Sequence, residues 1–188
     1  QALCEQLRVT RAVLPMSDQP SPTEVTTANG RVLAFQQWLV RERAEAELSR
    51  VVSRGRPRVT RQIREALETA ELLVLCPSNP YVSIDPILNV QGIREAIGGT
   101  PVVAVSPILG GKAVKGPLAS MLPALEGRTA SARNVALHYG ELLDGMLVHH
   151  GDAFDAGYPV LETNILIADR DSRKTLASEL LAFARTLR

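Results

Sequence analysis

The pattern of hydrophobic and polar positions along this chain changes near residue 60. From there on, segments with apolar residues three or four positions apart alternate with short, wholly apolar runs such as Leu72-Leu73-Val74-Leu75. The first pattern predicts amphipathic helices, and the second predicts strands that are buried on both faces. This alternation indicates an α/β fold with a mostly parallel sheet. The helices are expected at residues 61–70, 90–97, 117–125, 133–143 and 171–187, and the strands at 72–75, 101–105, 146–148 and 159–161.

The residues before position 60 show a different organisation. An apolar-rich run at residues 9–14 predicts a short strand, and a proline-rich loop follows it. Two further strand-like runs, at 24–27 and 31–35, flank Asn29-Gly30, a pair that accepts the positive φ of a tight turn. Residues 36–48 then have the pattern of a helix with many charges on its outer side. We therefore predict a β-hairpin and a helix.

These two patterns divide the chain. We predict a hairpin and helix segment at residues 1–58, part of the main domain or inserted in it, and an α/β nucleotide-binding core at residues 59–188. The chain opens on Gln1, and its first residues resemble the last turns of a helix that has no start signal. We expect that an upstream part of the fold is missing and that the domain is truncated at its N-terminus.

Composition narrows the functional classes. With 21 basic and 20 acidic residues the net charge is +1, which favours neither a nucleic-acid face nor binding to an anionic membrane. No apolar stretch approaches the roughly 20 residues that span a bilayer, and no leader peptide is recognisable. We expect a cytoplasmic protein with reduced thiols, in which Cys76 is a small buried side chain at the end of a strand.

Two loops that follow predicted strands carry the candidate ligand site. In parallel sheets, ligands bind beyond the carboxyl ends of the strands, where loops and helix N-termini offer polar groups. The first loop, residues 77–87, combines rigid prolines with short polar side chains. Its candidate substrate-binding residues are Ser78, Asn79, Pro80 and Ser83. The alternative is a proline-rich connection in which Ser78 or Ser83 only caps a helix.

The second loop, residues 106–117, contains two of the three lysines in the chain, which otherwise uses 18 arginines as its cations. Gly110 and Gly111 let the backbone approach an anion, while Lys112 and Lys115 supply compact positive charges. We therefore predict that these four residues bind substrate. The alternative is a flexible surface loop with solvated lysines, because the spacing matches neither the P-loop nor the Rossmann glycine motif.

Histidines and acidic residues give weaker signals. His138 and Tyr139, near the end of a predicted helix, are candidates to face the same cleft, and the alternative is a histidine that only packs. His149-His150 point to opposite sides of an extended chain, which does not favour a shared metal. We assign no catalytic residue and no metal ligand from the sequence, since Asp18 has no second carboxylate at a telling spacing.

Three stretches taken together resemble the 2-phospho-L-lactate transferase family of deazaflavin coenzyme F-420 biosynthesis. They are PSNPYVSIDPIL at residues 77–88, VSPILGGKAVKGP at residues 105–117 and HYGELLDG at residues 138–145, and VLPMSD at residues 13–18 is also similar. The resemblance covers essentially all 188 residues in the expected order. It implies a Rossmann-like three-layer fold. It also implies a reaction in which a 2-phospholactyl or phosphoenolpyruvyl unit moves from its guanosine diphosphate conjugate to the ribityl hydroxyl of the deazaflavin Fo, with release of GMP.

The resemblance further implies Mg²⁺, bound by aspartates in an N-terminal segment that also holds a glycine-rich phosphate loop. Nothing in this chain matches that segment, so we expect no metal ligands here and no transfer by this chain alone. A homodimer is a further expected assembly. One alternative is a non-catalytic, nucleotide-sugar-binding regulator of the same superfamily, whose corresponding loop is glycine-rich where this chain has Ser78-Asn79-Pro80. A stand-alone interaction module is the other.

Overall fold

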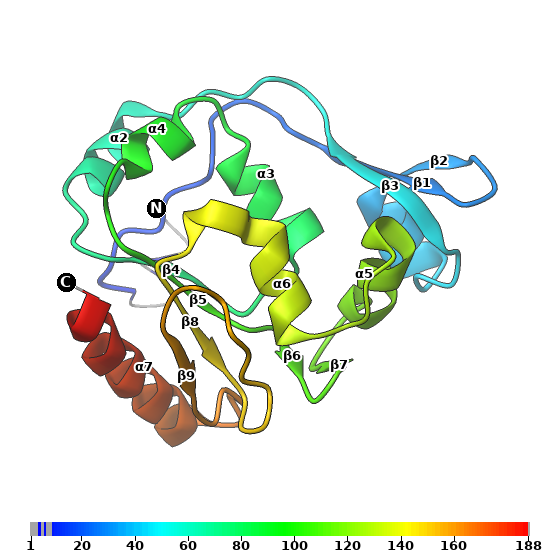
Figure 1. The fold of residues 1–188 in the computed structure, drawn as a ribbon. Coiled ribbons are helices and arrows are strands. Elements are labelled where there is room, and N and C mark those ends of the chain that lie inside the picture. Colours follow the sequence, from blue (N-terminus) through cyan, green and yellow to red (C-terminus); the bar gives the residue numbers. More distant parts are fainter. Residues whose placement is uncertain (1–3, 5, 7–8, 188) are drawn as a thin grey trace.

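The computed structural model describes residue 4, residue 6 and residues 9–187. Its main sheet has four parallel strands in the order β4-β5-β8-β9 (Figure 1). The strands are β4 (Leu73–Leu75), β5 (Val102–Val105), β8 (Gly145–Val148) and β9 (Val160–Glu162). Each lies within two residues of the run that predicts it, and the α/β fold with a parallel sheet is confirmed.

Helices cover both faces of this sheet and make three layers (Figure 1). Val103, Val105 and Leu147 pack against the α7 side chains, while Ala104 and Met146 belong to the core on the opposite face. This alternation follows from the period of two in a strand. The helices are α2 (Arg61–Glu68), α3 (Asp85–Leu88), α4 (Ile93–Ile97), α5 (Leu118–Glu126), α6 (Ala132–Tyr139) and α7 (Arg170–Ala184), with short turns η3 (Gly140–Leu142) and η4 (Arg185–Leu187).

Strand β4 corrects one expectation. Val74 is 40% exposed, so the predicted burial of this strand on both faces is wrong. β4 is at the edge of the sheet, and Val74 is in register with Val103 on the face covered by α7. The buried side chains that pack together with α7 include Val103 but not Val74, so the helix covers the centre of the sheet and leaves this edge open. Cys76, which follows β4, is exposed for the same reason, and not buried as expected.

A second, antiparallel sheet precedes the main one. It contains β1 (Thr23–Thr27), β2 (Val32–Ala34) and β3 (Leu48–Ser53) in the order β2-β1-β3. The hairpin of β1 and β2 is confirmed, and Gly30 at its turn has a φ of 84°. Side chains of this sheet, such as Val25 and Leu48, belong to the same apolar core as Val102 of β5. The predicted boundary between residues 58 and 59 stays a prediction.

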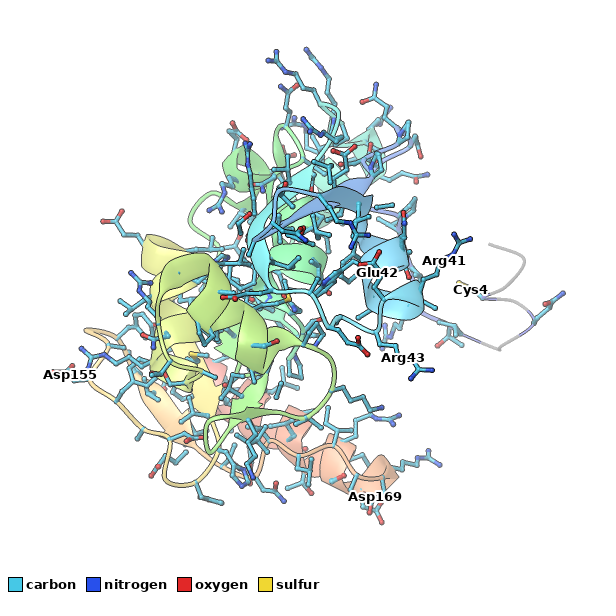
Figure 2. All side chains as sticks on the ribbon, turned by 90° about the vertical axis from the view of Figure 1, so that its right-hand side faces the viewer. Cys4, Arg41, Glu42, Arg43, Asp155 and Asp169 are labelled. Atoms are coloured by element: carbon cyan, nitrogen blue, oxygen red, sulfur yellow. The ribbon has the colours of Figure 1, made fainter. Side chains whose placement is uncertain are left out.

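Two predictions before residue 60 are wrong. Residues 9–14 form no strand, and Val13 is 67% exposed. The helix expected at residues 36–48 is reduced to a single π-helical turn, η1 (Gln37–Arg41). After it the chain reverses direction and forms β3, which pairs with β1. The charged side chains that were expected on a helix surface lie instead on this turn and loop, where Arg41 and Arg43 extend into solvent (Figure 2).

Gly145 shows how tightly α7 packs on the sheet. A Cβ atom at this position would lie 2.7 Å from the Phe183 ring and 3.0 Å from Leu187. We therefore expect Gly145→Val to lower the free energy of unfolding by about 1–3 kcal/mol, the usual cost of overpacking. Chemical denaturation measures this loss. Gly99→Val is the matched control, because a Cβ at Gly99 meets nothing within 4 Å; equal losses at both positions would contradict the packing argument.

Candidate functional site

A cavity of about 570 Å³ lies at the carboxyl ends of β4, β5 and β9. We call it the sheet-end cavity. Three chain segments contribute to its wall: residues 77–79 after β4, parts of residues 106–118 after β5, and residues 165–167 after β9, together with Arg173 of α7. The structure thus brings the two predicted loops together at the edge of the sheet where ligands of parallel sheets bind.

The first loop folds mostly into helical turns. Asn79 accepts a hydrogen bond from the Tyr81 backbone N–H at 3.0 Å and caps the π-helix η2 (Pro80–Ile84), which continues into α3. Ser78 and Asn79 therefore line the sheet-end cavity, whereas Pro80 is buried and Ser83 lies within the turn. The helix cap is Asn79, not Ser78 or Ser83.

The second loop is shaped by a buried hydroxyl and a small hairpin. The Ser106 Oγ donates to the Ile108 carbonyl at 2.9 Å and accepts from the Ile108 N–H at 3.1 Å, which fixes the turn directly after β5. Strands β6 (Ile108–Leu109) and β7 (Lys112–Ala113) then pair around Gly110 and Gly111, both with positive φ. The Gly110 N–H donates to an Asp152 carboxylate oxygen at 2.8 Å, which ties this hairpin to the loop after β8.

The two predicted lysines occupy different places. Lys115, with Gly116, lines the sheet-end cavity. Lys112, Gly110 and Gly111 belong to the tip of the β6-β7 hairpin and are not part of the cavity wall. Arg173, which the sequence did not single out, is the second cation of the wall, and none of the described residues that line the cavity is acidic. Two cations beside hydroxyl and amide groups give a site that suits an anionic ligand.

His138 lies behind the first loop, in a network that the sequence did not reveal. Its Nδ1 is 2.7 Å from Glu126 Oε1, and its Nε2 is 2.9 Å from Asp85 Oδ2. The Tyr81 hydroxyl donates to the same Glu126 oxygen at 2.8 Å, and Arg128 forms an ion pair with Glu126 at 3.0 Å. His138 therefore connects α6, the end of α5 and the start of α3. It is outside the wall of the sheet-end cavity, as is Tyr139.

The network shifts the ionisation of its members. Burial opposes the charged imidazolium, but hydrogen bonds and charges of Asp85 and Glu126 outweigh it, so the pKa of His138 is raised above 6.5. Burial likewise opposes the Glu126 carboxylate, but hydrogen bonds from His138 and Tyr81 hold its pKa below 4.5. Burial raises the pKa of Tyr81 and of Tyr139, so both phenols stay protonated near neutral pH.

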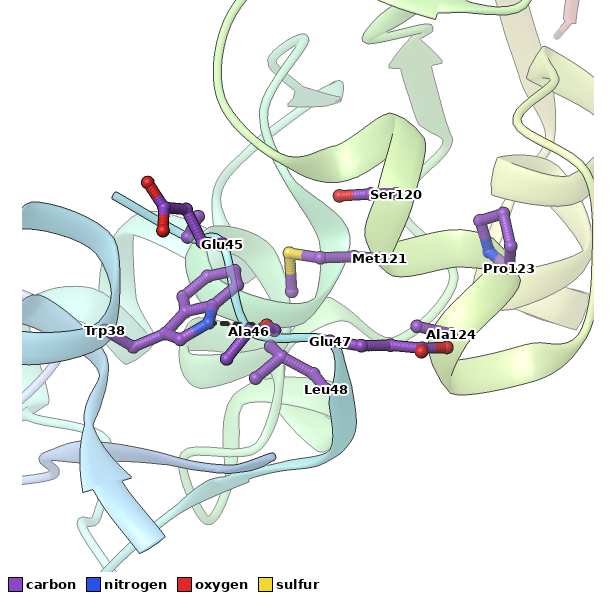
Figure 3. A pocket seen from close by; sticks show the side chains of 10 residues that line it. Trp38, Glu45, Ala46, Glu47, Leu48, Ser120, Met121, Pro123 and Ala124 are labelled. Carbon is purple, nitrogen blue, oxygen red and sulfur yellow. Dashed lines mark hydrogen bonds between the residues drawn. The ribbon is translucent and has the colours of Figure 1, made fainter. Parts of the chain in front are cut away.

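A second cavity, of about 310 Å³, lies between α5 and the segment that runs from η1 to the start of β3 (Figure 3). Its wall includes Trp38, whose Nε1–H donates to the Ala46 carbonyl at 2.8 Å, and Met121 of α5. Met121 also accepts a hydrogen bond from the Asn79 side-chain amide, N to S 3.2 Å, and so joins this region to the sheet-end cavity. The loop here is strained, since Arg43 and Ala44 have φ values of 50° and 56°.

The residues that the structure describes contain no ready-made metal site. In residue 4, residue 6 and residues 9–187 no three His, Cys, Asp or Glu side chains lie close enough to hold a metal ion. Mg²⁺ requires carboxylate oxygens together with water or phosphate ligands. No chemical step is therefore assigned to magnesium here.

In residue 4, residue 6 and residues 9–187, none of the helices combines the length and apolar character needed to cross a membrane.

Comparisons with known proteins place the chain among transferase relatives. A phosphoenolpyruvate transferase from Thermobifida fusca is 36% identical over 100% of this chain and 61% of its own length. A 2-phospho-L-lactate transferase from Methanospirillum hungatei is 36% identical over 77% of this chain and 48% of its own length. The chain therefore spans about half to three fifths of these relatives.

A crystal structure of a Bacillus halodurans protein supports the fold alone. It has a TM-score of 0.65 at 19% identity, over 96% of this chain and 65% of that one.

Residues 1–176 match the family described as 2-phospho-L-lactate transferase CofD. That match covers nearly the whole chain and includes both loops of the sheet-end cavity. The chain belongs to the 2-phospho-L-lactate transferase CofD family.

Proposed function

We propose that this protein takes part in transferring a 2-phospholactyl or phosphoenolpyruvyl unit from a guanosine diphosphate conjugate to the deazaflavin Fo, with release of GMP. The observation that carries the proposal is the composition of the sheet-end cavity. Ser78 and Asn79 of one loop and Lys115 of the other line a single cavity, and Arg173 adds a second cation. The relatives named as transferases for these two acids support the same reaction class.

The chemistry requires positioning and charge neutralisation more than a protein nucleophile. The acceptor hydroxyl oxygen forms a bond to the phosphorus that carries the acid, the bond from that phosphorus to the GMP phosphate oxygen breaks, and the hydroxyl proton is released. Lys115 and Arg173 neutralise the diphosphate of the donor. Ser78 and Asn79 hydrogen-bond the nucleotide or the ribityl chain of the acceptor. The proposal includes Mg²⁺, a cytoplasmic location and a homodimer.

Calorimetric titration of the purified chain with GDP and, separately, with a UDP-sugar tests the donor site, in each case with and without magnesium. We expect saturable binding of GDP and no binding of the UDP-sugar. Binding of the UDP-sugar alone would favour the regulator of the same superfamily instead. Absence of binding to either ligand would contradict a donor site in the sheet-end cavity.

GMP release from the guanosine conjugate in the presence of Fo measures transfer separately from binding. The expectation that these 188 residues do not perform transfer by themselves stays a prediction, and GMP production by the purified chain would overturn it.

A further inference from the structure

Three segments that are distant in sequence meet at His138. Asp85, at the start of α3, contacts one ring nitrogen, and Glu126, at the end of α5, contacts the other. The Tyr81 ring packs edge-on against the His138 ring, with centroids 4.6 Å apart, and the Tyr81 hydroxyl also reaches Glu126. His138 therefore lies at the junction of η2, α5 and α6.

The geometry favours a protonated ring. A neutral imidazole has one N–H, so it can donate to only one of two carboxylates, and its other nitrogen would then present a lone pair to an oxygen. Here both nitrogens are within 2.9 Å of carboxylate oxygens. With both carboxylates ionised, both contacts are favourable only when both nitrogens carry hydrogen. The arrangement is thus that of an imidazolium between two carboxylates.

The charges around this ring balance in that state. The ionisable groups in contact with the ring are Asp85 from α3, Glu126 from α5, Tyr81 from η2 and its own neighbour Tyr139, and Arg128 from the following turn pairs with Glu126. Two carboxylates then face two cations, His138 and Arg128, while the phenols are neutral. Loss of the His138 proton leaves Asp85 facing a ring without charge, whereas Glu126 keeps Arg128 and the Tyr81 hydroxyl.

This network holds both ends of η2. Tyr81, near its start, is tied to Glu126, and Asp85, directly after its end, is tied to His138. Asn79 caps the start of the same turn and, with Ser78, lines the sheet-end cavity. A shift of η2 would therefore move a wall of the cavity.

We propose that the His138 imidazolium, held between Asp85 and Glu126, is a positioning residue that fixes η2 and with it the Ser78-Asn79 wall of the sheet-end cavity. The consequence for ligand binding rests on the proposed function, since it takes that cavity as the nucleotide site. The pKa of His138 is raised above 6.5, so the ordered wall is fully present below that pH and is lost as the pH rises through the raised value.

Hydrogen exchange of the η2 backbone amides, corrected for intrinsic rates and followed from pH 6 upward, tests the positioning without any ligand. We expect protection to fall with rising pH in the full chain. In His138→Gln, protection should be low and independent of pH. In Asp85→Asn, protection should begin to fall at a lower pH, because the imidazolium loses one of its two neighbouring negative charges. His150→Gln is the matched control, since His150 is exposed and lines a different cavity beside β9 and α7, and it should behave as the unmodified chain. Unchanged, pH-independent protection in both the unmodified chain and His138→Gln overturns the proposal.

GDP titration of the same variants tests the link to the cavity. Below the pKa of His138 we expect His138→Gln to bind GDP about fivefold more weakly than the unmodified chain, the lower end of couplings between separate sites. If protection titrates but GDP does not bind, the positioning stands and the proposed nucleotide function fails. If GDP binds with the same affinity at every pH while protection titrates, the link between η2 and the cavity is wrong.

Discussion

Replacing Lys115 by alanine should weaken GDP binding about ten- to a hundredfold. In the part of the chain that the structure describes, Lys115 and Arg173 are the two cations in the wall of the sheet-end cavity, and no acidic side chain lines that wall to offset them. A hydrogen bond to a charged partner contributes about 1.5–3 kcal/mol, and each 1.4 kcal/mol corresponds to roughly a factor of ten in affinity. Isothermal titration with GDP at constant ionic strength measures the change.

Lys112 provides the sharpest comparison for this prediction. It has the same side chain and lies in the same loop, but it is at the hairpin tip and not in the cavity wall. Lys112→Ala should therefore change GDP affinity much less than Lys115→Ala, and Lys174→Ala, on the exposed side of α7, should not change it. Equal losses for Lys112→Ala and Lys115→Ala would mean that the hairpin tip also contacts the ligand, as the sequence alone predicts. Unchanged affinity in Lys115→Ala would remove the charge argument.

The parallel sheet could be predicted because its information is local. Each of β4, β5 and β8 is a short apolar run bounded by polar residues or proline, and the hairpin turn carries Asn29-Gly30. In β5 and β8 the apolar character follows from burial on both faces, which helices on both sides of a parallel sheet provide. The edge position of β4 was not predictable, because strand order depends on pairing between distant segments.

Residues 36–48 show where local pattern fails. Their apolar and charged positions fit a helix, but the Trp38 indole donates to the Ala46 carbonyl, and Leu48 begins a strand that pairs with β1 more than twenty residues earlier. These long-range contacts outweigh a weak helical preference. No signal within the segment indicates that its polar half becomes a turn and loop that lead into the edge strand β3.

The candidate site was predictable only in its loops. Ser78, Asn79 and Lys115 follow strand ends, which is a local signal, and the structure brings them to one cavity. Arg173 reaches that cavity from the start of the last helix, and the partners of His138 are 12 and 53 residues away. Such contacts depend on how helices pack over the sheet, and spacing along the chain does not contain that information.

Replacing Trp38 by alanine should lower the free energy of unfolding by about 3–5 kcal/mol, the range for large aromatic truncations in a core. Trp38 is 1% exposed and is among the largest fully buried side chains of the described residues. The neighbouring cavity of about 310 Å³ would grow, and the Ala46 carbonyl would lose its donor. Chemical denaturation followed by circular dichroism measures the loss. Trp38→Phe keeps an aromatic ring and loses mainly the hydrogen bond, which contributes about 1 kcal/mol, so it should cost less than Trp38→Ala.

The same variant tests whether the antiparallel sheet and the main sheet unfold together. Trp38 and Val25 share one apolar core with Val102 and Met146, so loss of the indole should weaken both sheets. Hydrogen exchange of β1 and β5 amides in Trp38→Ala should show equal decreases in opening free energy, as one cooperative unit requires. If β1 loses protection while β5 keeps it, the segment up to residue 58 unfolds independently. The shared core would then be a contact between two separate units, with the α/β core able to keep the sheet-end cavity when the antiparallel sheet opens.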